Sequence, residues 1–131
     1  GTPAHIHYKG LVSDEDYNLY LSATDACLLP LKLTLANKAR WPSKFVDYLA
    51  AGKPIVATPV SDFKEIFKAS DIGLLSESDS PEEFADLLLE MTRRKANWQQ
   101  MGTNGRNYAA SYLSWNIIAK RIVNFYHKII D

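Results

Sequence analysis

The stretch that decides the fold runs from Ala39 to Pro54 and reads ARWPSKFVDYLAAGKP. It predicts a loop, one short helix and a stop. Pro42 suits the first helical position, because a proline there loses no hydrogen bond. Gly52 suits the position just past the helix, and Pro54 prevents its continuation. Apolar residues recur between these limits at helical spacing and predict one buried face, made of Phe45, Val46, Leu49 and Ala50.

The beginning of this predicted helix carries features that attract an anion. A helix N-terminus has unpaired N–H groups and a partial positive charge, so it favours phosphate. Ser43 and Lys44 lie in the first turn, and Asp47 follows Lys44 by three residues, so the two charges share one face. The arrangement would suit a nucleotide, with its diphosphate at the helix tip and its ribose at the carboxylate. A plainer alternative, an amphipathic helix with an exposed Lys–Asp pair, stays open at this point.

The loop before the helix, residues 31–41, is basic. No acidic residue lies between Asp25 and Asp47, and the bases in that interval are Lys32, Lys38, Arg40 and Lys44. A charged loop is often no more than a solvated surface. This loop, however, follows an apolar run and precedes a helix, and open α/β sheets bind ligands at that place.

Composition limits the classes of protein that need to be considered. The 131 residues suffice for one domain, and 47% apolar with 23% charged residues is ordinary for a globular protein. The net charge of zero gives no support to a nucleic-acid partner. Cys27 is the only cysteine, which excludes an internal disulfide and leads us to expect a cytoplasmic protein. The histidines His5, His7 and His127 lack metal-ligand spacing, so we expect no metal site.

Strand and helix patterns alternate along the chain. Short apolar runs predict strands at residues 6–8, 26–29, 55–57 and 73–75, and the continuous run Ala26–Leu29 would be buried on both faces. Ser13 and Ser80 are capping residues that open two helices. Helices are predicted at about residues 14–23, 63–69 (capped by Ser61 or Asp62), 81–94, 98–112 (interrupted near Gly102 and Gly105) and 115–130. The alternation predicts an α/β fold, a parallel sheet with helices on both faces, and terminal helices that pack on it or reach toward a neighbour.

The order of these segments resembles that of a known family. The relevant pieces are IHYKG at residues 6–10, ATDACLLP at 23–30, PSKFVDYLAAGKPIVA at 42–57, Glu65 with GLL at 73–75, and SW at 114–115. They are similar to the C-terminal, donor-binding half of retaining GT-B glycosyltransferases of family 4, often called glycosyltransferase group 1. The resemblance covers nearly the whole chain. It implies a Rossmann-like sheet that forms part of a GT-B fold, followed by extra C-terminal helices.

The resemblance also implies a reaction. In this family a sugar moves from a nucleotide-sugar to an acceptor, a nucleoside diphosphate leaves, and no cofactor or obligatory metal is needed. The signature of the region is two glutamates separated by seven residues. The second, which binds the donor ribose, corresponds here to Asp47. The first corresponds to Ala39, a departure that leaves the catalytic residues unassigned.

The resemblance further implies that residues 1–131 are one N-terminally truncated nucleotide-sugar-binding domain. Two strands of the family's donor half, and its acceptor domain, would precede this chain, so we expect the chain alone to be inactive. The strand at residues 6–8 would lie at one edge, separated from Ala26–Leu29 by a gap that neighbouring copies could fill by self-association. Peripheral membrane contact is expected only through the absent domain. Polysaccharide or glycolipid biosynthesis is the process that the family suggests.

The candidate donor-binding residues follow from both lines of reasoning. Arg40, Ser43 and Lys44 would meet the diphosphate and Asp47 the ribose. The resemblance adds the backbone of Leu11 and Val12 for the base, Gly10 for close approach of the ligand, and Glu65 near the donor sugar. Gly10 equally suits a plain turn, and Glu65 an exposed helix charge. Trp41 could shield the phosphates or pack in the core, and packing is favoured. Two rival functions stay open, namely a non-catalytic nucleotide-sugar-binding module, suggested by Ala39, and a structural α/β domain.

Overall fold

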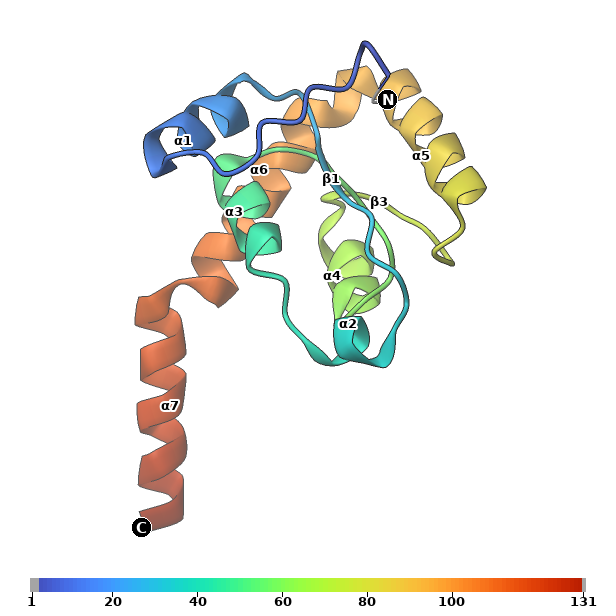
Figure 1. Cartoon of the computed structure of the whole chain (residues 1–131). Helices are drawn as coiled ribbons and strands as arrows, with labels where there is room; N and C mark the ends of the chain where they lie inside the picture. The colour runs from blue at the N-terminus through green and yellow to red at the C-terminus, as the bar shows by residue number, and fades with distance from the viewer. Residues whose placement is uncertain (1–2, 131) are drawn as a thin grey trace.

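The computed structural model describes residues 3–130, and its centre is a parallel three-stranded sheet (Figure 1). The strands are β1 (Cys27–Leu29), β2 (Ile55–Ala57) and β3 (Gly73–Leu75), in the order β1-β2-β3. Their register is regular, with Cys27 opposite Ile55 and Ile55 opposite Gly73. All three strands were predicted from their apolar runs, and the expected α/β fold with a parallel sheet is confirmed.

Helices cover both faces of this sheet. Ile55 and Ala57 of β2 face a cluster built with α3 and α4, whereas Val56 faces a second cluster with Phe84 and Met91 of α5. This division follows from the alternation of side chains along a strand. The helices are α1 (Asp14–Ala23), α2 (Leu35–Ala39), α3 (Ser43–Ala51), α4 (Phe63–Ser70), α5 (Pro81–Arg93), α6 (Trp98–Tyr108) and α7 (Trp115–Ile130), with a 3-10 turn at Lys95–Asn97 and a π-helical turn at Ala109–Leu113.

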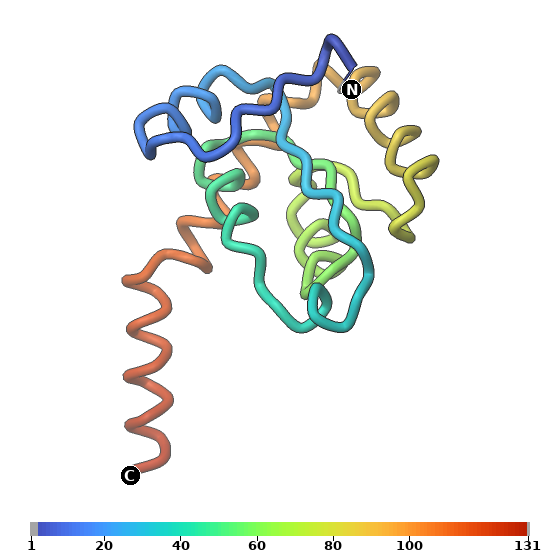
Figure 2. Tube along the Cα trace, in the orientation of Figure 1, coloured from blue at the N-terminus to red at the C-terminus, as the bar shows by residue number. Residues whose placement is uncertain are grey.

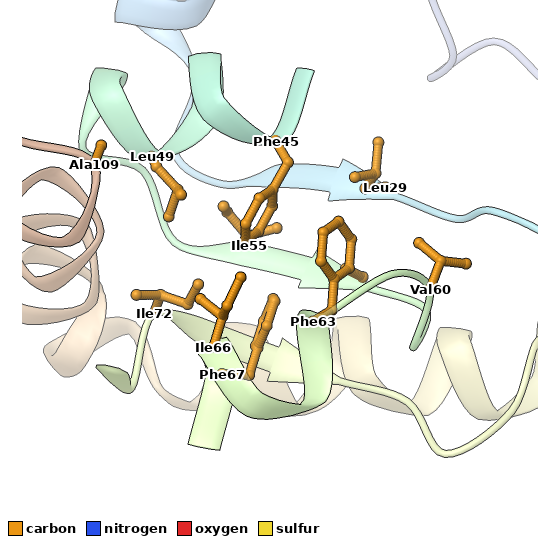
Figure 3. Packing of buried hydrophobic residues seen from close by; sticks show 11 residues of the cluster. Leu29, Phe45, Leu49, Ile55, Val60, Phe63, Ile66, Phe67, Ile72 and Ala109 are labelled. Atoms are coloured by element: carbon orange, nitrogen blue, oxygen red, sulfur yellow. The ribbon is translucent and has the colours of Figure 1, made fainter. Parts of the chain in front are cut away.

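The larger cluster is mainly aliphatic with three phenylalanines, and it fixes α3 on the sheet (Figure 3). Phe45 of α3 and Phe63 of α4 are fully buried, and their ring centroids lie 4.2 Å apart. Leu49, one turn after Phe45, is also fully buried. Within the predicted apolar face of α3, Ala50 is exposed, and Tyr48 packs against the cluster in its place. The reason is that Phe45 and Leu49 point toward the centre of the cluster. Ala50, which lies to one side of them on the helix, therefore faces solvent.

Two predicted strand features are wrong. Residues 6–8 form no strand; Ile6 and Tyr8 are exposed, and the Ile6 N–H donates to the Pro3 carbonyl in a local turn. A strand needs a partner, and among residues 3–130 the edge strand β1 pairs with β2 alone. Leu28 of β1 is 44% exposed, so the run Ala26–Leu29 is buried on one face only. Its register with Val56 puts Leu28 on the α5 side, at the sheet edge that α5 leaves uncovered.

The predicted helix boundaries are close to those observed. The Ser13 and Ser80 hydroxyls accept from the N–H groups of Asp16 and Glu83, as capping residues should. Asp62 precedes α4 but makes no side-chain capping bond. Residues 31–41 were predicted as a loop, yet they contain the short helix α2, which the Thr34 hydroxyl caps. Thr34 is the signal that this prediction overlooked.

Gly102 and Gly105 do not interrupt α6, contrary to expectation, because both face α3 at close range. An ideal Cβ on Gly102 would lie 1.9 Å from the Gly52 carbonyl oxygen, and one on Gly105 would lie 3.1 Å from Leu49 Cδ2. Gly52 ends α3 in the left-handed conformation, at φ +69°, as predicted. The glycines therefore serve helix packing rather than a break in the helix.

The last helix, α7, extends away from the rest of the chain (Figures 1 and 2). It does not pack on the sheet; it packs against the π-helical turn that precedes it. Its apolar residues are largely exposed, including Ile122, Phe125 and Ile129. That α7 reaches toward another part of the protein stays a prediction. No helix within residues 3–130 has the length and apolar character needed to cross a membrane.

The thiol of Cys27 is expected to resist alkylation in the folded protein. Burial raises its pKa from an ordinary 9.0 to about 11, although Lys53 nearby lowers it in part. Because the thiolate is the reactive form, this shift alone lowers the reactive fraction at pH 8 about 100-fold. We therefore expect labelling by iodoacetamide at pH 8 to be at least about 100-fold slower in buffer than in 6 M guanidinium chloride. Equal labelling rates in mass spectrometry would contradict the burial of Cys27.

Candidate functional site

The N-terminus of α3 opens into a cavity at the carboxyl end of β1. Pro42 precedes the helix, and no side chain caps it. The cavity has a volume of about 270 Å³ and is lined by Leu29, Leu31, Arg40, Pro42, Ser43 and Lys44. Leu29 is the last residue of β1, so the geometry confirms that α3 begins at the carboxyl edge of the sheet. This is where the doubly wound α/β fold leaves room for a ligand.

Two positively charged side chains, Arg40 and Lys44, line this cavity together with Ser43. The Phe45 N–H donates to the Pro42 carbonyl, which leaves the amides of Ser43 and Lys44 as the orphan donors of the first turn. Free amides, a helix dipole and two cations are the groups that would suit a doubly charged anion. The three residues that the sequence assigned to a diphosphate are thus brought together.

The basic loop that supplies Arg40 is held in place rather than freely solvated. The Leu31 N–H donates to the Thr58 hydroxyl, which itself donates to the Leu31 carbonyl at 2.6 Å. The Leu33 N–H donates to an Asp79 carboxylate oxygen at 2.9 Å, and the Asn37 side chain donates to the Lys32 carbonyl. These bonds tie the beginning of the loop to Thr58, which follows β2, and to Asp79, which lies between β3 and α5.

Asp47 lies one turn further along α3 and is bonded to a residue from α1. The Tyr17 hydroxyl donates to Asp47 Oδ2 at 3.1 Å, and Lys44 Nζ lies 5.0 Å from the centre of the Tyr17 ring. Burial, followed by the charge and hydrogen bond of Asp47, raises the pKa of Tyr17 well above its ordinary value.

A second cavity, of about 330 Å³, is lined by Tyr17, Asn18, Leu21, Ser22, Asp47, Ala50 and Ala51. Lys44 and Asp47 thus border neighbouring cavities along the same helix.

The remaining predicted site residues lie outside these two cavities. Gly10 has a φ of +65°, which agrees with a plain turn, and Leu11 is fully exposed while Val12 is half-buried. Glu65 is an exposed residue in the first turn of α4. Trp41 packs edge-on against Phe45 and Phe63 but is 39% exposed, so it lies at the margin of the core and only partly follows the prediction. The structure therefore groups Arg40, Ser43, Lys44 and Asp47 and leaves the others apart (Figure 1 shows α1, α3 and α4).

A third cavity, of about 310 Å³, adjoins the first and was not predicted. It shares Leu31 with the cavity at α3 and also contacts Lys32, Thr58 and Asp79. Phe84 and Leu88 of α5 supply an apolar wall. The signal that could have revealed it is positional, because Pro30, Thr58 and Ser78–Ser80 each follow a predicted strand.

Comparison with known proteins decides the family. Residues 1–108 match the protein family described as Glycosyl transferases group 1. The chain belongs to this family. The resemblance seen in the segments around residues 42–57 is confirmed by this match, which covers most of the chain.

Several relatives of this group 1 chain are glycosyltransferases. A phosphatidyl-myo-inositol mannosyltransferase of Mycobacterium leprae is 22% identical over 129 residues, which are 98% of this chain and 33% of that protein. A GDP-mannose-dependent alpha-(1-6)-phosphatidylinositol monomannoside mannosyltransferase of Mycobacterium tuberculosis is 21% identical over 127 residues, 95% of this chain and 33% of that protein. An uncharacterized glycosyltransferase of Methanocaldococcus jannaschii is 27% identical over 86 residues, 66% of this chain and 24% of that protein. The chain thus spans between a quarter and a third of the length of these relatives.

A solved structure supports the fold of this group 1 chain. The sucrose-phosphate synthase of Thermosynechococcus elongatus superimposes with a TM-score of 0.74 and 21% sequence identity, over 92% of this chain and 29% of that one. The Rossmann-like α/β arrangement of a GT-B protein is therefore confirmed. Family and fold leave the role of each site residue as a prediction.

Proposed function

We propose that this chain is the donor-binding part of a glycosyltransferase and that it binds a nucleotide-sugar at the beginning of α3. The observation that carries this proposal is the uncapped N-terminus of α3, which opens into a cavity lined by Arg40, Ser43 and Lys44. A diphosphate carries the negative charge and the acceptor oxygens that complement these positively charged donors.

Each residue has a role in the proposed reaction. The amides of Ser43 and Lys44, with the Lys44 ammonium and the Arg40 guanidinium, would stabilise the charge that grows on the leaving diphosphate. Asp47 would accept hydrogen bonds from the ribose and position the donor. Retention of sugar configuration, and an acceptor bound by parts of the protein outside this chain, belong to the same proposal. Because one relative is described as GDP-mannose-dependent, GDP-mannose is the first donor to test.

The binding test uses the full-length protein and two variants of α3. GDP, UDP and ADP are titrated by calorimetry against the parent, Lys44→Ala and Asp47→Ala. Each variant is expected to lose about 1–3 kcal/mol of binding free energy for the diphosphate that the parent binds best, because each loses a charge-assisted contact. Lys120→Ala on α7 and Asp86→Ala on α5 remove the same charges from exposed positions that do not line the cavity, and these variants should bind like the parent.

Binding that does not saturate at millimolar diphosphate would overturn the proposal and leave a structural α/β domain. Saturable binding that both α3 variants retain in full would move the site elsewhere in the protein.

Ala39 favours a second candidate, a nucleotide-sugar-binding module without transfer activity. This residue ends α2, is exposed, and occupies the position where the family resemblance places a glutamate. The two candidates differ in turnover. Release of labelled mannose or GDP from GDP-mannose by the full-length protein, abolished in Lys44→Ala, would establish an enzyme. Tight binding of GDP-mannose with no release over hours, either to water or to an added acceptor, would establish the module.

A further inference from the structure

Helix α1 meets α3 through one side chain that touches both charged groups of the proposed donor site. None of the residues of α1 is fully buried, so the helix is held mainly by a few specific contacts. The Tyr17 hydroxyl donates to Asp47 Oδ2 at 3.1 Å, and the face of its ring lies under Lys44 Nζ at 5.0 Å. Lys53 Nζ, just beyond the end of α3, donates to the Ser22 carbonyl and touches neither group.

We propose that Tyr17 is a positioning residue, which holds the Asp47 carboxylate for the ribose and the Lys44 ammonium for the diphosphate. The inference rests on the proposed donor site and adds a residue from outside α3 to it. Asp47 and Lys44 are both exposed and lie three residues apart on one turn. Without an external contact, each side chain would sample several rotamers and would lose that freedom when a ligand binds. The Tyr17 contacts order both before binding.

The bond to Tyr17 leaves Asp47 able to bind a ligand. A carboxylate has about four lone-pair positions, and the Tyr17 hydroxyl uses one of them on Oδ2. The remaining positions suffice for two ribose hydroxyls. Anchoring matters more for Asp47 than it would for glutamate, because the shorter side chain cannot adjust its reach.

The chemistry of Tyr17 suits this role at neutral pH. Burial and the neighbouring Asp47 carboxylate raise the pKa of the phenol, so the hydroxyl stays protonated and remains a donor. The ring is also close enough to Lys44 for a cation–π contact, whose usual limit is about 6 Å. One side chain therefore makes two separable contacts, and substitution can remove them one at a time.

Tyr17→Phe removes the hydroxyl and keeps the ring, whereas Tyr17→Leu removes both. The full-length variants are titrated with the nucleoside diphosphate that the parent binds best, with its 2′,3′-dideoxy analogue, and with inorganic pyrophosphate. For Tyr17→Phe we expect affinity for the ribose-containing ligand to fall about 3- to 10-fold, with less than a twofold change for the dideoxy analogue. For Tyr17→Leu we expect pyrophosphate affinity to fall as well, about 2- to 5-fold.

Tyr20→Phe is the matched control, because Tyr20 lies on the same helix and is exposed. It should bind all three ligands like the parent. If Tyr17 only docks α1, its substitution would lower thermal stability and would weaken binding of the ribose and dideoxy ligands equally. That result would overturn the inference. The inference would also be overturned if the parent prefers the ribose ligand over the dideoxy analogue and Tyr17→Phe binds both with the affinities of the parent. If the parent binds neither a nucleoside diphosphate nor pyrophosphate, the proposed donor site fails, and the inference fails with it.

Discussion

The Phe45→Ala protein is expected to lose about 3–5 kcal/mol of unfolding free energy. Phe45 is fully buried between α3 and α4, where its ring contacts Phe63 at a centroid distance of 4.2 Å and Phe67 at 6.1 Å. Truncation removes this burial and leaves a cavity that the neighbouring rigid rings of Trp41, Phe63 and Phe67 cannot easily fill. Urea denaturation followed by circular dichroism measures the loss.

Phe125→Ala makes the same chemical change at a position on α7 that is 61% exposed. It should change the unfolding free energy of the chain by less than about 0.5 kcal/mol. Equal destabilisation by the two substitutions would mean that α7 is buried against another part of the protein. A Phe45→Ala protein as stable as its parent would contradict the packing shown in Figure 3.

The loss at Phe45 should also reach the candidate site, because Phe45 directly follows Lys44 in the first turn of α3. The Phe45 N–H donates to the Pro42 carbonyl, and Trp41 packs edge-on against its ring at 5.7 Å. The aromatic core thus fixes the turn that presents the amides of Ser43 and Lys44. Fold stability and the proposed anion binding therefore both depend on this one helical turn.

This link explains why the central helix could be predicted from sequence. Gly52 and Pro54 end α3 through backbone chemistry that acts within a few residues, and Phe45 and Leu49 repeat at helical spacing. Local rules of this kind need no knowledge of the rest of the chain. They located the end of α3 correctly and misplaced its beginning by only one residue, since Pro42 precedes the helix instead of opening it.

The errors have a different origin, because they depend on partners distant in sequence. The residues at 6–8 have a strand-like pattern but find no strand beside them. The Tyr17–Asp47 hydrogen bond joins residues 30 positions apart, and no sequence periodicity in α1 or α3 indicates it. Candidate residues on one turn, such as Ser43, Lys44 and Asp47, could therefore be found, and their external support could not.

The glycines of α6 show the same limit of prediction from sequence. A glycine within a helical segment indicates a break unless the element that packs against it is known. Gly102 faces the backbone at the end of α3, where the Gly52 N–H is bonded to the Leu49 carbonyl. The Arg106 guanidinium, one turn later, donates to the carbonyls of Ala50 and Ala51 and holds the helices together. Close approach of two backbones is what only glycine permits here.

Gly102→Ala is therefore expected to destabilise the protein by at least about 3 kcal/mol, although alanine favours a helix over glycine by about 1 kcal/mol. The new Cβ would lie 1.9 Å from the Gly52 carbonyl oxygen, and no side chain can move aside to make room. Helix α6 must shift away from α3, which strains the Arg106 bonds and opens the packing beneath Gly105. Thermal unfolding of the full-length protein measures the effect.

Gly105→Ala is the matched control, because it makes the same change one turn later in the same helix. Its Cβ would lie 3.1 Å from Leu49 Cδ2, the end of a flexible side chain that can yield by a few tenths of an ångström. Helix propensity then competes with a small clash, and the net change should stay within about 1 kcal/mol of zero. If the two variants are equally stable, α6 and α3 do not approach at Gly102 and Gly52. A large difference in the expected direction would place a close backbone contact at the end of α3, the helix whose beginning lines the candidate site.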